Sequence, residues 1–105
     1  MTILHEVEAV LTRKNKDLIK LAQGRTNAEK DRLYTKANGV NTVRNILIHN
    51  YALNTTEQGI LTRTMNNVAK AIENTTVPAY KDGLEIGFET IKAEYLVEFP
   101  IGATR

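Results

Sequence analysis

Residues 78–99, PAYKDGLEIGFETIKAEYLVEF, decide the fold class of this chain. Large apolar residues recur in this stretch at steps of four and three, namely Tyr80, Leu84, Phe88, Ile91, Tyr95 and Phe99. That period predicts an α-helix beginning near Pro78, because residues three and four apart share one helix face. The alternative is a β-hairpin turning at Asp82-Gly83, since Gly83 and Gly87 each cost a helix up to about 1 kcal/mol relative to alanine. We predict the helix, ended by the segment 99–102.

Apolar residues recur at helical spacing through the rest of the chain as well. A first helix is predicted at 2–22 and a second at 26–37, where Thr26 and Glu29 form a capping box. Asn38-Gly39 is expected to end that second helix, because glycine and asparagine are favoured just after a helix.

Two more helices are expected between these segments and the last one. Asn41 is expected to cap a third helix that ends near Leu53. Thr55 with Gln58 is a second capping box, and it opens a fourth helix. The pattern therefore predicts one all-α domain over 1–105, a compact bundle of four to five helices.

The composition limits the chemistry that the chain can perform. With 105 residues, 42% hydrophobic and 25% charged, it is long enough for one buried core. Cysteine and serine are both absent, which excludes disulfides, thiolate metal sites and thiol or serine nucleophiles. No run approaches the roughly 18 apolar residues of a membrane span, and no glycine-rich phosphate loop is present. We expect a cytoplasmic protein without a cofactor, a metal or a membrane partner.

The net charge of +2 is unevenly distributed. Residues 11–36 carry eight Lys or Arg against three acids, whereas residues 73–105 carry six acids against three basic residues. The basic segment could bind an anion such as a nucleotide or nucleic acid. The candidate anion-binding residues are Lys14, Lys16, Lys20, Arg25 and Lys30. The alternative is that the basic and acidic ends attract each other, within one chain or between subunits.

The octapeptide RNILIHNY, Arg44–Tyr51, contains the residues best suited to catalysis. On a helix Arg44, Ile48 and Tyr51 share a face, and His49 lies at its edge. An arginine can bind a phosphate with two hydrogen bonds, and a histidine can transfer protons near neutral pH. The same residues could equally form the border of a packed helix.

This octapeptide resembles the signature of the HEPN superfamily, a set of helical nucleotide-binding and ribonuclease domains, and the resemblance extends over about residues 41–73. It implies that Arg44 and His49 lie at a dimer interface and act on the scissile phosphate of RNA, with Asn45 orienting the phosphate or the histidine. In a toxin subgroup the tyrosine at the place of Tyr51 is nucleotidylated, which implies a regulatory role. The resemblance also implies two long antiparallel helices and a connector before Arg44.

The sequence is therefore compatible with two functions. The first is a small non-catalytic binding protein, homo-oligomeric, that holds a nucleotide, a nucleic acid or a partner protein, as accessory proteins of phages and mobile elements often do. The modest core and the uneven charge motivate the oligomer. The alternative is a HEPN-like, metal-independent ribonuclease that uses Arg44 and His49.

Overall fold

The computed structural model describes residues 3–53 and 56–99, and these residues form four α-helices and no strand. The helices are α1 (Ile3–Gln23), α2 (Asn27–Tyr51), α3 (Glu57–Asn74) and α4 (Pro78–Glu98). The prediction of an all-α bundle of four to five helices is confirmed, and α4 replaces the alternative hairpin at Asp82-Gly83. Thr55 and the residues 100–102, which figured in the predicted capping box and helix end, lie outside the described residues.

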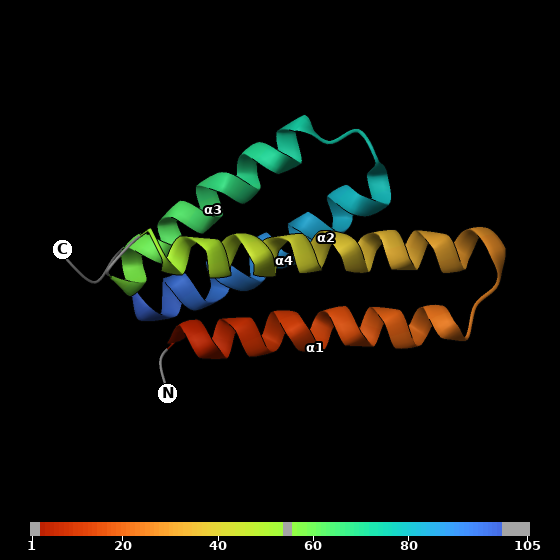
Figure 1. The fold of residues 1–105 in the computed structure, drawn as a ribbon, viewed down its shortest axis with the longest axis horizontal. Helices are drawn as coiled ribbons and strands as arrows, with labels where there is room; N and C mark the ends of the chain where they lie inside the picture. The colour runs from red at the N-terminus through yellow and green to blue at the C-terminus, as the bar shows by residue number, and fades with distance from the viewer. Residues whose placement is uncertain (1–2, 54–55, 100–105) are drawn as a thin grey trace.

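The four helices pack around one core. α1 and α2 lie side by side and antiparallel, α4 passes behind α2, and α3 runs obliquely back from the end of α2 (Figure 1). The most extensive packing is between α2 and α4. The buried core consists of leucine, isoleucine and valine side chains, namely Leu4, Val7, Leu11, Val40, Val43, Leu47, Ile60, Leu61, Val68, Leu84 and Ile91. Withdrawal of these side chains from water is the main driving force for folding.

α2 is one continuous helix, and the predicted helix end at Asn38-Gly39 and new start at Asn41 are wrong. Gly39 is buried in the middle of α2, where α4 approaches it closely. A Cβ atom built on Gly39 would lie 2.9 Å from the Cα atom of Gly83 and 2.9 Å from the backbone nitrogen of Leu84. The glycine is therefore placed there for close helix packing and not for a turn.

The capping predictions are only partly matched. Thr26 makes no side-chain capping hydrogen bond, and Glu29 lies 3.9 Å from both Arg25 and Arg32 instead. The chain enters α2 through Asn27, whose φ of 52° lies in the left-handed region that asparagine tolerates. The first capping box is therefore wrong, although the predicted helix start is correct to within one residue.

The second helix cap lies close to the predicted place. Thr56 is the cap of α3, and its hydroxyl accepts a hydrogen bond of 3.0 Å from the backbone N–H of Gly59. The Gln58 side chain does not turn back to the cap, because its amide donates to the Tyr95 hydroxyl of α4 at 3.3 Å.

Candidate functional site

Arg44 faces α1. Its Nη2 atom donates to Glu8 Oε2 at 3.1 Å, and both side chains are largely covered, at 33% and 27% exposed. Its Nε atom is buried and has no hydrogen-bond partner among the described residues. Arg44 therefore has its charge balanced within the fold, and it joins α2 to α1.

His49 faces α3. Five residues turn an α-helix by about 140° beyond a full turn, so a side chain at 49 lies far around the axis from one at 44. His49 is exposed and lines a pocket of about 460 Å³ between α2 and α3. Within one chain the structure therefore separates Arg44 from His49, whereas it places Asn45 in the same pocket as His49.

The described residues that line the pocket include a positively charged side chain and no carboxylate. α2 and the turn after it contribute Thr42, Asn45, Ile46, His49, Asn50 and Leu53, and α3 contributes Arg63 and Asn67. Among the described residues the Arg63 side chain makes no ion pair and no hydrogen bond. An unpaired guanidinium beside a histidine and several amides favours a bound anion.

A buried asparagine forms the floor of the pocket. Asn50 is 1% exposed, and its amide donates to Thr64 Oγ1 at 2.9 Å and to Asn67 Oδ1 at 3.2 Å. Thr64 in turn donates to the carbonyl of Ile60 at 2.7 Å. Because the Asn67 oxygen is held by Asn50, the Asn67 NH₂ group is the end that remains to donate to a ligand.

Tyr51 lies on the Arg44 side of α2. Its hydroxyl is buried without a hydrogen-bond partner among the described residues. Burial raises the pKa of Tyr51 above its ordinary value, and the carboxylates of Glu8 and Glu57 raise it further. In this conformation the hydroxyl is not accessible to a modifying enzyme, so the regulatory role implied by the resemblance would require the hydroxyl to become exposed.

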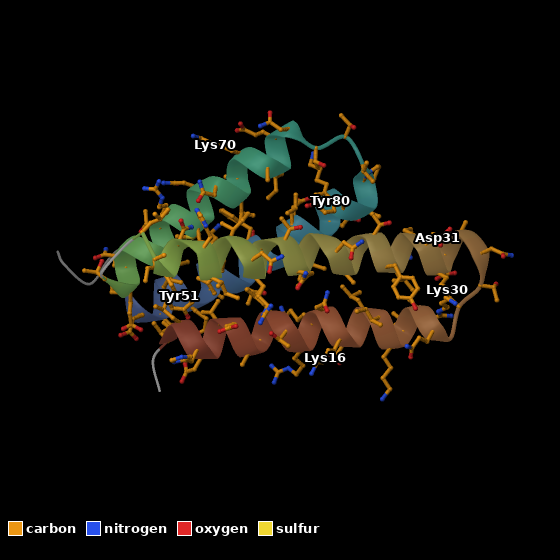
Figure 2. The ribbon with its side chains drawn as sticks, viewed as in Figure 1. Lys16, Lys30, Asp31, Tyr51, Lys70 and Tyr80 are labelled. Atoms are coloured by element: carbon orange, nitrogen blue, oxygen red, sulfur yellow. The ribbon has the colours of Figure 1, made fainter. Side chains whose placement is uncertain are left out.

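Three of the five basic residues predicted to bind an anion make separate contacts within the fold. Lys14 donates to Thr90 Oγ1 of α4 at 3.0 Å, Arg25 pairs with Glu29, and the Lys30 ammonium lies 6.0 Å from the centre of the Tyr34 ring. Lys16 projects from α1 and Lys30 lies near the α1–α2 turn, well apart (Figure 2). No ion pair among the described residues joins the basic segment to the acidic C-terminal helix.

A second hollow, of about 540 Å³, lies along α1. Arg13 and Lys16 line it together with Glu8 and Asp17, so its charges are mixed. In the part of the chain that the structure describes, no three His, Asp or Glu side chains come together as metal ligands. None of the described helices is long and apolar enough to cross a membrane.

Arg63 and Asn67 were missed at the level of sequence. They lie four residues apart on a polar face of α3, a spacing that any solvated helix face shows. Only the packing of α3 against α2 shows that they line the same pocket as His49.

Comparisons of the chain with models of known protein families, with curated proteins and with solved structures found no match.

Proposed function

We propose that the chain is a non-catalytic binding protein that holds an anionic ligand in the pocket between α2 and α3. The observation that carries the proposal is the Arg63 guanidinium, which makes no ion pair among the described residues and lies in a pocket that His49 and none of their carboxylates line. Charge-assisted hydrogen bonds from arginine are about twice as strong as neutral ones. At about 460 Å³, the volume of the pocket lies within the range of about 300 to 1,000 Å³ that is typical of ligand sites.

The contrast with Arg44 supports this assignment. Arg44 has a carboxylate partner 3.1 Å away, so a ligand would have to displace Glu8 to reach it. Arg63 is exposed and needs no such exchange. The mixed charges of the α1 hollow likewise disfavour an anion there, because Glu8 and Asp17 would repel it.

Calorimetric titration with sulfate and with acetate tests the proposal. Wild type is expected to bind with a dissociation constant in about the millimolar range, and Arg63→Gln should weaken binding about tenfold or more. The matched control is Arg32→Gln, which removes the same charge from an exposed site in the first third of α2. Equal losses in the two variants would show a non-specific charge effect and would contradict the pocket.

The second candidate is the HEPN-like ribonuclease. What favours it is that His49 and Asn45 are both exposed on one pocket, where an RNA strand could reach them. Its arginine could be Arg44, released from Glu8, or Arg63, which already shares the pocket with His49.

Incubation of RNA with wild type, His49→Ala, Arg44→Gln and Arg63→Gln separates these possibilities. Loss of cleavage in the His49 and Arg44 variants supports the HEPN-like pair, and loss in the His49 and Arg63 variants assigns the role to Arg63. Absence of cleavage by wild type contradicts the ribonuclease and leaves anion binding.

We also propose that the chain forms a homo-oligomer. Large apolar side chains remain exposed on the described surface, among them Leu21 at 46% and Val97 at 77%. Burial of such side chains against a second copy would remove them from water and strengthen a small core.

A further inference from the structure

The two ends of the α2–α3 pocket differ in chemistry. α2 and α3 run in opposite directions, and the bonds from Asn50 to Thr64 and Asn67 fix their register. Residues late in α2 therefore lie beside residues early in α3. His49, Leu53 and Arg63 line the end nearer the α2–α3 turn, whereas Thr42, Asn45, Ile46 and Asn67 line the pocket farther from it.

The cationic end is suited to one negative charge. Arg63 is the single permanently charged side chain among the lining residues. The first turn of α3, whose backbone N–H groups could hold a phosphate, carries Glu57, and that carboxylate accepts from the backbone N–H of Ile3 at 3.1 Å. The pocket therefore offers one guanidinium and no free helix N-terminus. This suits a ligand with one negative charge, such as a carboxylate, which arginine binds through two parallel hydrogen bonds.

The other end of the pocket is suited to an amide and an apolar group. The exposed Asn45 side chain makes no hydrogen bond among the described residues, so it can both donate and accept. The Asn67 NH₂ group adds a second donor. Ile46 supplies apolar surface at this end, and Leu53, which is 53% exposed, supplies it at the cationic end.

From this arrangement, and resting on the proposed function, we infer that the ligand is an α-amido carboxylate with an apolar side chain. Arg63 and His49 bind its carboxylate, Asn45 and Asn67 bind its amide, and Ile46 and Leu53 contact its side chain. Such a group exists at the C-terminus of a polypeptide and in a free N-acylated amino acid.

N-acetyl-leucine is the probe, compared with acetate, which lacks the amide and side chain, and with N-acetyl-leucinamide, which lacks the charge. We expect N-acetyl-leucine to bind wild type about tenfold more tightly than acetate, and the leucinamide to bind at least tenfold more weakly than N-acetyl-leucine. Arg63→Gln should abolish the difference between the acid and the amide. Asn45→Ala, at an exposed position, should lower the affinity for N-acetyl-leucine toward that of acetate.

Equal affinity of wild type for acetate and N-acetyl-leucine would overturn the inference and leave the proposed anion pocket standing. Absence of binding by acetate, sulfate and N-acetyl-leucine alike would overturn both. A peptide ending in leucine separates the two sources. Binding at least as tight as that of N-acetyl-leucine assigns the pocket to a chain end, and binding of N-acetyl-leucine alone assigns it to the free small molecule.

Discussion

Arg44 and Arg63 show how two arginines of one sequence take different roles. Arg44 lies beside Glu8 and joins α1 to α2, while Arg63 makes no ion pair among the described residues and lines the same pocket as His49. The sequence singled out Arg44 because of its distance from His49 along the chain. Spacing along a helix determines only which face a residue occupies, and the partner helix determines what that face meets.

The Arg44–Glu8 pair should contribute measurably to stability. Because both side chains are about two-thirds covered, we expect Arg44→Gln to lower the free energy of unfolding by about 1 kcal/mol. Urea denaturation measures the change. The double variant Glu8→Gln/Arg44→Gln should lose less than the sum of the single variants, and strict additivity would contradict a direct interaction.

Tyr51 should ionise late in an alkaline titration. Its folded pKa is raised above the unfolded value of 10.0, mainly by burial, so the folded state retains the proton longer than the unfolded state does. The associated stability is present below pH 10 and is lost as the pH rises through the folded pKa. Tyr95 should ionise earlier, because hydrogen bonds from Gln58 and then Thr62 lower its pKa.

Tyr51→Phe tests this assignment. The variant should keep wild-type stability near pH 7, because the lost hydroxyl has no hydrogen-bond partner among the described residues, and it should be more resistant than wild type to unfolding above pH 10. Thermal melts at both pH values measure the effect. Identical alkaline sensitivity in the two proteins would contradict a buried Tyr51 hydroxyl.

At the scale of the helices, the close contact between α2 and α4 depends on two glycines, Gly39 and Gly83, which have no side chain. Gly39→Ala would gain helix propensity of about 1 kcal/mol, yet its Cβ would lie 2.9 Å from the Gly83 Cα in a backbone contact that cannot yield. We expect a net loss of about 1–3 kcal/mol, the usual cost of overpacking. Thermal and urea unfolding measure the loss.

Gly24→Ala is the matched control for that substitution. A Cβ at Gly24 would have its nearest neighbour, the carbonyl oxygen of Leu21, at 3.6 Å, an ordinary contact. Its stability should therefore stay within about 0.5 kcal/mol of wild type. A Gly39→Ala variant as stable as Gly24→Ala would contradict the close approach of the two helices.

The helices could largely be predicted from the sequence, and their junctions could not. The four-and-three period of the last segment correctly indicated α4, because periodicity reports the face that a helix buries. Asn38-Gly39 misled because glycine gives the same local signal at a turn and at a close helix contact, and only the position of Gly83 distinguishes them. His49 and Asn45 were singled out from local sequence, whereas Arg63 needed the pairing of α2 with α3.

At the scale of the whole molecule, no ion pair among the described residues joins the basic N-terminal segment to the acidic C-terminal helix. Lys14 reaches α4 but binds the Thr90 hydroxyl, not an acid. The basic and acidic ends are therefore still able to meet across a subunit contact, together with the exposed apolar side chains.

Self-association should follow from that surface. Sedimentation velocity is expected to show an oligomer that dissociates on dilution, and Val97→Lys should shift it toward the monomer because it places a charge on a side chain that is 77% exposed. The substitution Lys70→Glu, at an exposed polar position, serves as the control. A monomer at every concentration would contradict the oligomer.

The anion pocket is tested most directly by residue-resolved NMR during titration with acetate. Binding at the proposed site predicts that the shifted resonances are those of the His49 ring and the Arg63 Nε–H group, and that Arg63→Gln removes the shift of the His49 ring. Shifts centred on the basic residues of α1 and its turn, with the α2–α3 resonances unchanged, would contradict it.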